Sequence, residues 1–191
     1  MTEEQQIRTA RLWLRRWRPS DRPPFTALNA DPDVMEHFPR LLTRAVSDTL
    51  VDRIECGFTR HGYGLWAVEM ASTGAFIGFT GLVHPDFDAH FTPAVEVGWR
   101  LARSAWGHGY ASEAGRAALA FGFERAGLTE IVSFTTVANA RSQAVMRRIG
   151  LTHDPADDFD HPRLPPDDRL CRHVLYRIGI ADWRASADGR G

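Results

Sequence analysis

The sequence predicts a mixed α/β domain whose central sheet is mostly antiparallel and flanked by helices. Apolar residues alternate with other residues from Val95 to Leu101, which is typical of a strand with one buried face. Two further apolar runs, at 64–70 and 76–83, flank a turn that contains Gly74, and together they predict a hairpin. Beyond residue 101 the pattern changes to helix, strand, helix and strand, so helices and sheet alternate to the end of the chain.

The segment before the hairpin predicts one strand followed by helices. The strand is expected at 11–17, and Ser20 is a plausible N-cap for a helix that runs to about Asn29. A short helical piece is expected from Asp31 to about Phe38. Thr43 is placed to cap a longer helix that ends at Gly62, with an apolar stripe formed by Val46, Leu50, Ile54 and Phe58.

The second half of the chain predicts the rest of the sheet and its covering helices. The expected elements are a polar loop at 84–93, a helix at 110–126, a strand at 130–137, a helix at 139–148 closed by Gly150, a strand at 172–178 and a short helix at 180–185. The segment from Asp154 to Asp168 is rich in Asp and Pro, and we expect a long loop there.

Length and composition indicate one domain and exclude several classes of protein. The chain has 191 residues and a formal net charge of −1, without the basic excess of a nucleic-acid-binding protein. We expect a single domain at 8–186 with flexible ends at 1–7 and 187–191. The apolar runs are too short to span a bilayer and the first residues lack a secretory pattern, so a cytoplasmic location is expected. Cys56, Cys171 and the 8 scattered histidines fit no metal spacing, so no metal is expected.

The motif with most chemical content is Gly107-His108-Gly109, between the strand at 95–101 and the next helix. Two glycines before a helix allow the backbone N–H groups to approach an anion, which the helix dipole also favours. A Gly-x-Gly turn that simply ends a strand fits this motif about equally well. The third glycine of a dinucleotide-binding fingerprint is missing, and a Walker A loop is excluded because the chain contains no lysine.

Several segments together resemble the GNAT acetyltransferase superfamily, within it the RimJ/RimL-like branch. The segment 106–114, Trp-Gly-His-Gly-Tyr-Ala-Ser-Glu-Ala, is similar to the acetyl-CoA loop of that branch. Asn139-Ala-Arg-Ser142 is similar to its second cofactor motif, and Glu96-Val-Gly-Trp99 to its central strand. The similarity runs from about Arg11 to about Ile178. It implies a sheet with splayed central strands and acetyl-CoA as co-substrate.

The resemblance assigns residues to the parts of acetyl-CoA. The diphosphate would meet backbone N–H groups between Gly107 and Ser112, and the peptide-like pantetheine arm would pair with the strand edge if the central strand splays after Gly98. The expected cofactor-binding residues are Trp99, Arg100, Leu101, Gly107, His108, Gly109, Tyr110, Ala111, Ser112 and Asn139. Asn139 could bind cofactor amides, cap the next helix, or do both. His108 could touch phosphate or point to water.

The chain departs from the family pattern at two positions. Trp106 stands where the loop motif often begins with Gln or Arg, which leaves the backbone cradle unaffected. Met146 stands where many members have the tyrosine that protonates the departing thiolate. Because a thioether cannot donate a proton, this role must pass to another residue or to water.

The catalytic candidates are Glu96 as general base and Ser142 as proton donor to the leaving thiolate. Glu96 is equally compatible with a solvated or salt-bridged strand residue, and Ser142 with a first-turn serine that bonds to the backbone. His161 and the acidic side chains at 154–168 are rival bases. Neither cysteine lies near the motifs, which favours direct attack by the amine over an acyl-enzyme.

The expected function is acetyl transfer from acetyl-CoA to a primary amine, either a protein or peptide N-terminal amine or a small amine. The acidic loop at 154–168 would suit a cationic acceptor. The expected assembly is a monomer or a homodimer. Two alternatives remain open: a non-catalytic acyl-CoA sensor, which the Met146 departure favours, and an α/β binding domain without CoA.

Overall fold

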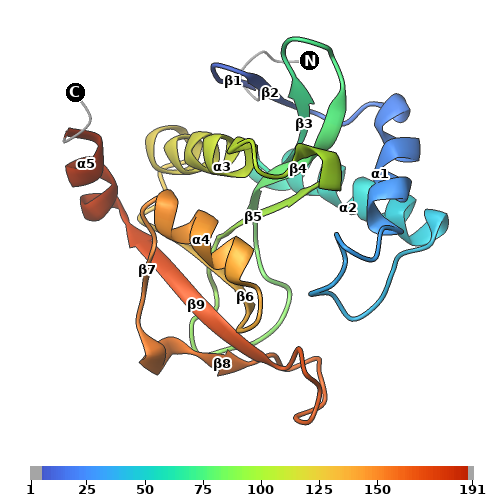
Figure 1. Ribbon diagram of the computed structural model, residues 1–191. Helices are drawn as coiled ribbons and strands as arrows, with labels where there is room; N and C mark the ends of the chain where they lie inside the picture. Colours follow the sequence, from blue (N-terminus) through green and yellow to red (C-terminus); the bar gives the residue numbers. More distant parts are fainter. Residues whose placement is uncertain (1–5, 189–191) are drawn as a thin grey trace.

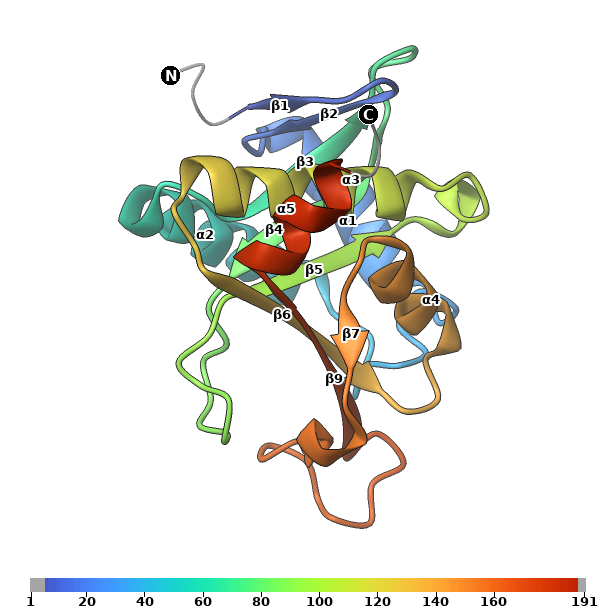
Figure 2. The same cartoon turned by 90° about the vertical axis from the view of Figure 1, so that its left-hand side faces the viewer.

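The computed structural model describes residues 6–188 and contains one central sheet with helices on both faces (Figures 1 and 2). The strand order over the described residues is β1-β2-β3-β4-β5-β6-β9-β7, and β8 pairs with β9. All neighbouring pairs are antiparallel except β5 and β6, which are parallel. The predicted fold class, a mixed and mostly antiparallel α/β sheet, is confirmed.

The strands follow the apolar patterns of the sequence closely. Their bounds are Ile7–Arg8 (β1), Leu12–Arg15 (β2), Leu65–Met70 (β3), Phe76–Val83 (β4), Glu96–Leu101 (β5), Glu130–Thr136 (β6), Thr152–His153 (β7), Phe159–Asp160 (β8) and Arg172–Gly179 (β9). The predicted hairpin is β3–β4, and its turn uses Gly74 at a φ of 71°. β1 begins at Ile7, which pairs with Leu14, so pairing starts inside the segment for which a flexible end was expected.

The α-helices are Arg22–Asn29 (α1), Arg44–His61 (α2), Tyr110–Ala120 (α3), Ala140–Arg148 (α4) and Ile180–Asp188 (α5). Helix α3 continues as the π-helical segment Phe121–Arg125, so the helical run ends where the sequence predicted. Thr43 caps α2 as expected, because its side chain accepts a hydrogen bond from the Val46 N–H. α3 covers one face of the sheet, and α1 and α2 cover the other (Figure 2).

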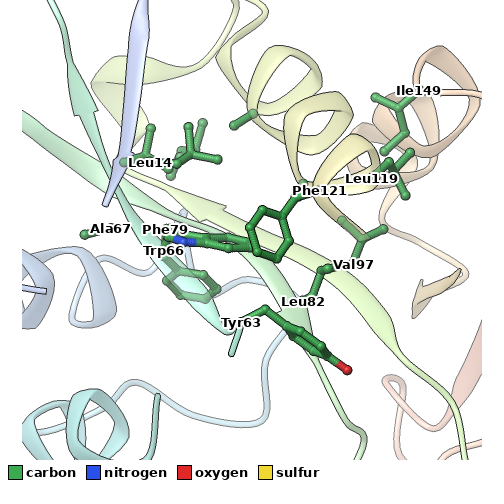
Figure 3. Packing of buried hydrophobic residues seen from close by; sticks show 14 of the residues in the cluster. Leu14, Tyr63, Trp66, Ala67, Phe79, Leu82, Val97, Leu119, Phe121 and Ile149 are labelled. Carbon is green, nitrogen blue, oxygen red and sulfur yellow. The ribbon is translucent and has the colours of Figure 1, made fainter. Parts of the chain in front are cut away.

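The main core covers both faces of the strands β2–β5, where α3 packs on one face and α1 and α2 pack on the other (Figure 3). Trp66 on β3 is fully buried, and its ring meets those of Phe58 and Phe121 edge-on at 5.5 and 5.0 Å. A second cluster, on the β6–β9 half of the sheet, contains Phe91, Val132, Phe159 and Leu175. Ile131 of β6 and Val174 of β9 belong to the main core, whereas the next residues, Val132 and Leu175, belong to the second cluster. Since successive strand residues point to opposite faces, the two clusters lie on opposite faces of this half of the sheet.

Three local predictions were wrong: Ser20 is not a helix cap, one segment expected to be helical forms turns, and one expected loop contains short regular elements. Ser20 caps no helix; it lies in the 3₁₀ turn Pro19–Asp21, and α1 begins after it at Arg22. Residues 31–38 form turns, and the Asp31 carboxylate accepts the N–H of Asp33, which competes with helix formation. The loop at 154–168 contains a 3₁₀ turn, Pro155–Asp157, and strand β8.

The sheet is packed so tightly around Gly81 on β4 that it leaves no room for a side chain. A Cβ at Gly81 would lie 2.1 Å from the Gly64 carbonyl oxygen, which is backbone and cannot rotate away. We expect Gly81→Ala to lower the free energy of unfolding by about 1–3 kcal/mol or more. The matched control is Gly57→Ala in α2, where a Cβ meets nothing within 4 Å; better helix propensity should raise stability by up to about 1 kcal/mol. Urea unfolding of both variants measures this, and equal stabilities would contradict the prediction.

Candidate active site

The two central strands separate almost as soon as they meet. The β5–β6 ladder consists of the single register pair Glu96 and Val132, supported by the Val132 N–H, which donates to the Val95 carbonyl at 2.9 Å. β5 then continues along β4 as far as Leu101, while β6 continues along β9 as far as Thr136. The sheet therefore splays as predicted, but two residues earlier than Gly98. The edge of β5 from residues 97 to 101 faces the gap.

The glycine loop follows β5 and leads into α3. Gly107 and Gly109 have φ values of 81° and 79°, a left-handed conformation that other residues adopt at a cost. Gly109 is the N-cap of α3, so the first N–H groups of the helix have no intrahelical acceptors. The Trp106 indole N–H donates to the Leu101 carbonyl at 2.9 Å, which fixes the start of the loop. Ser112 adds a buried hydroxyl that lacks a hydrogen-bond partner among the described residues.

The loop is braced from outside by the turn between β1 and β2. The Glu113 carboxylate accepts the Thr9 hydroxyl at 2.6 Å, the Arg11 backbone N–H at 2.9 Å and the Arg11 Nε at 2.6 Å. The Arg11 Nη1 also donates to the His108 carbonyl, and its guanidinium lies over the Tyr110 ring. Partial burial raises the pKa of Glu113, but these hydrogen bonds outweigh it and hold the pKa below its usual range.

One cavity of about 1440 Å³ joins the splay to the glycine loop. It is lined by eleven of the twelve residues that the sequence predicted for the site, namely Glu96, Trp99, Arg100, Leu101, Gly107, Gly109, Tyr110, Ala111, Ser112, Asn139 and Ser142. The exception is His108, whose ring is exposed and stacks on Tyr110 at 5.5 Å. The shared cavity shows that these residues lie together. It does not by itself show what each residue does.

The start of α4 forms the wall of the cavity nearest β5. Asn139 is the N-cap of α4, and its side-chain oxygen accepts the Ser142 N–H at 3.1 Å. The Ser142 hydroxyl in turn accepts the Trp99 indole N–H at 3.1 Å, which leaves its own proton free to be donated. Met146, one turn further on, lines the cavity but is almost fully buried. The most accessible hydroxyl of this turn is therefore that of Ser142.

Two ionisable side chains of β5 project towards the other face of the sheet, the face covered by α1 and α2. Burial raises the pKa of Glu96 to about 8. Burial also lowers the pKa of Arg100 to about 10. The Arg100 guanidinium donates to the Asn29 side-chain oxygen at 2.6 Å and lies 4.0 Å from the centre of the Phe38 ring. Among residues 6–188, no carboxylate forms an ion pair with Arg100.

Residues 33–40, here called the strap, form a side of the cavity that sequence reasoning missed. Arginines from three other segments hold it: Arg103 pairs with Asp33 at 3.1 Å, Arg141 pairs with Glu36 at 3.2 Å, and Arg169 donates to the Glu36 carbonyl at 2.9 Å. No short-range pattern signals these contacts, because their partners lie about 70 to 130 residues apart in the chain.

The opposite side of the cavity comes from the segment 161–173 and from β6. The lining residues here are Phe134, Thr136, His161, Arg163, Leu164, Leu170 and His173. The carboxylates at 154–168 do not line the cavity, contrary to the expectation that this loop would attract a cation. Several are engaged elsewhere: Asp157 pairs with Arg177, Asp158 with His153, and Asp160 with Arg172.

Within residues 6–188, no three His, Cys, Asp or Glu side chains gather as a metal site would require. No helix in that same part of the chain is long and apolar enough to cross a membrane.

The sequence matches the family of Acetyltransferase (GNAT) domains over residues 11–152. An uncharacterized Bacillus subtilis protein, YkkB, is 32% identical over 127 residues, which cover 66% of this chain and 73% of YkkB. The FsC-acetyl coenzyme A-N(2)-transacetylase of Aspergillus fumigatus is 33% identical over 134 residues, covering 68% of this chain and 56% of that protein.

Solved structures of acetyltransferases share the fold of this chain. An acetyltransferase from Agrobacterium tumefaciens superposes with a TM-score of 0.74 at 28% identity, covering 91% of this chain and 93% of that one. RimL, a ribosomal L7/L12 alpha-N-protein acetyltransferase in complex with coenzyme A, shares the fold with a TM-score of 0.73 at 19% identity, covering 94% of this chain and 99% of its own.

The splayed sheet, the glycine loop and these similarities define the class of the protein: the chain belongs to the GNAT acetyltransferase family. It is an acetyl-CoA-dependent N-acetyltransferase.

The brace at Glu113 predicts a pH-dependent contribution to stability. Because the folded-state pKa is depressed, the contribution is fully present above the unfolded pKa of about 4.3 and is lost as pH falls through the folded value. We expect Glu113→Gln to cost about 1 kcal/mol at pH 7 and nearly nothing below about pH 3. Chemical denaturation of both proteins between pH 3 and pH 7 measures the difference. A difference that stays constant over this range would rule the brace out.

Proposed function

We propose that the protein acetylates a primary amine of a small molecule or of a peptide by direct attack of the amine on acetyl-CoA. The observation that carries the proposal is the continuity of the cavity. It runs from the N-terminus of α3, past the open edge of β5, to a side formed by the strap and the segment 161–173. This one cavity thus contains a loop that can bind an anion, a strand edge that can pair with amide groups, and space for a second substrate.

The residues present fit coenzyme A. The left-handed Gly107 and Gly109 bring the loop backbone to the helix start, where free N–H groups suit a diphosphate. The partnerless hydroxyl of Ser112 lies among them and lines the cavity. The unpaired edge of β5 suits the amide groups of a pantetheine arm. Bound acetyl-CoA supplies an activated thioester carbonyl.

We assign the catalytic candidates roles that follow from their surroundings. The Ser142 hydroxyl, oriented by Trp99, is placed to protonate the departing thiolate, in a turn where Met146 has no proton to give. With a pKa of about 8, Glu96 is about nine-tenths protonated at pH 7. At neutral pH the Glu96 carboxyl is therefore mostly protonated and able to donate a hydrogen bond, and it can act as a base as the pH rises towards its pKa.

The acceptor side of the cavity favours an amine that carries one positive charge over a polyamine. Its two strap carboxylates, Asp33 and Glu36, are already paired with arginines. The opposite wall presents phenylalanine and histidine side chains in place of a row of carboxylates. The name of the A. fumigatus relative, an N(2)-transacetylase, supports an amine nitrogen as the acceptor.

A two-part assay tests this function. Acetyl-CoA should raise the melting temperature by mass action, and thiol release should occur with single amines or peptide N-termini faster than with spermidine. A Gly109→Val variant, strained at a φ of 79°, should show a smaller thermal shift. Binding of acetyl-CoA with no turnover on any amine would contradict the proposal and favour the sensor hypothesis.

Glu96 also predicts a change in stability with pH. Its folded-state pKa lies above the unfolded value, so the carboxyl destabilises the fold increasingly as pH rises from about 4.5 to about 8. We expect Glu96→Gln to match the wild type at pH 5 and to be roughly 1–3 kcal/mol more stable at pH 8.5, since cavity water offsets part of the burial penalty. Thermal melts from pH 5 to pH 9 measure this, with the exposed Glu124→Gln as control. Parallel curves for Glu96→Gln and the wild type would show that the carboxyl is not buried.

A further inference from the structure

Two imidazoles meet on the acceptor side of the cavity. His173 lies on β9 opposite Thr136 of β6, and His161 follows β8. Their ring centres are 5.1 Å apart, and both rings line the cavity. The sequence predicted His161 as a rival base but did not single out His173. His173 lies twelve residues later in a predicted strand, so no local motif joins it to His161.

The hydrogen bonds of the two rings fix which nitrogen carries the proton. The His173 Nδ1 lies 3.0 Å from the Cys171 carbonyl, which can only accept, so Nδ1 holds the proton and Nε2 keeps a lone pair. The His161 Nδ1 accepts the backbone N–H of Arg163 at 3.3 Å, so its proton is on Nε2. The pair therefore presents one basic nitrogen, on His173, and one N–H donor, on His161.

The surroundings keep both rings neutral. Burial, foremost, lowers the pKa of each histidine below its ordinary value. Phe134 and Phe159 have ring centres 6.1 and 5.4 Å from that of His173, and Phe87 lies 4.6 Å from His161. The charged and titratable groups on the elements around the pair include Asp86, Arg163, Arg169, Glu36 and His37, and Arg163 is itself paired with Asp86. Asp160 and Arg172, next to the two histidines in the chain, form an ion pair with each other.

A neutral histidine can accept a proton at neutral pH, which a protonated Glu96 carboxyl cannot do. An acceptor amine reaches the site mostly as ammonium and must lose a proton before it attacks. At neutral pH the carboxyl of Glu96 already carries a proton, so it cannot take another. Glu96 and His173 project from the same face of the splayed sheet, since Glu96 pairs with Val132 and His173 pairs with Thr136, which is four residues further along β6.

We propose that His173 Nε2 is the general base that deprotonates the acceptor amine, and that His161 is a positioning residue that packs against the His173 ring. This inference rests on the proposed acetyl transfer. The proton of the ammonium passes to His173 Nε2, and the freed nitrogen forms a C–N bond with the acetyl carbonyl carbon. The C–S bond breaks, and coenzyme A leaves as thiolate, which takes a proton from Ser142 or water. The new amide nitrogen loses its second proton to the Ser142 oxygen or to water, which restores the donor. His173 returns its proton to solvent through the cavity. His161 stays neutral and holds the other ring in place.

The decisive variant is His173→Asn, whose amide can still donate to the Cys171 carbonyl but offers no basic nitrogen. With the fastest amine of the panel, we expect kcat/KM at pH 7 to fall about 10²- to 10⁴-fold, while the thermal shift caused by acetyl-CoA is unchanged. The acidic limb of the wild-type pH profile, expected below about pH 6.5, should disappear. His161→Gln, which keeps an N–H donor, should lose about 3- to 10-fold and retain the limb.

The matched control is His153→Asn. His153 stacks on Tyr176 and pairs with Asp158 outside the cavity, so its loss should leave kcat/KM within about two-fold. Wild-type kcat/KM and an intact acidic limb in His173→Asn would overturn the assignment. A wild-type pH profile of kcat/KM governed by a single group with a pKa near 8 would also overturn it. This measurement does not require any variant to fold. Absence of wild-type turnover with every amine would instead overturn the proposed acetyl transfer itself, and this inference with it.

Discussion

The site depends on one constraint: β5 and β6 share a single register pair and then part. Each strand remains anchored on its far side, β5 to β4 through Leu101 and β6 to β9 through Thr136, so the gap cannot close by a slip of either strand. Facing edges with unpaired N–H and C=O groups are unfavourable unless water or a ligand satisfies them. The splay therefore creates a peptide-like binding edge in the middle of the sheet.

The walls around this gap are held by arginines that reach across the chain. Arg11 fixes the glycine loop through Glu113 and the His108 carbonyl, while Arg103, Arg141 and Arg169 fix the strap. Exposed ion pairs contribute little to stability one by one. Here they join segments that have no strand pairing with one another. Their effect is to set where the cavity walls lie, and the helices and strands supply most of the free energy of folding.

The same cavity contains groups that a core selected for stability alone would avoid. Glu96 has its pKa raised to about 8, Arg100 has no carboxylate partner among the described residues, and His173 is buried with a free ring nitrogen. Each departs from the rule that buried ionisable groups are paired. The departures fall along one face of the splayed strands. Such clustering is typical of an active site, where reactivity requires groups that are not fully satisfied by the protein.

The sequence by itself determined the strand–glycine–helix unit, the β3–β4 hairpin and the Asn139 cap, because these depend on backbone conformations and spacings within a few residues. It failed at residues 31–38, where the Asp31 carboxylate accepts a backbone N–H and the chain forms turns. Only the tertiary structure decided that Glu36 and His173 share a cavity with Glu96, and which of their protons are held at neutral pH. Such properties depend on burial and on distances through space between segments far apart in the chain, and local patterns do not encode either.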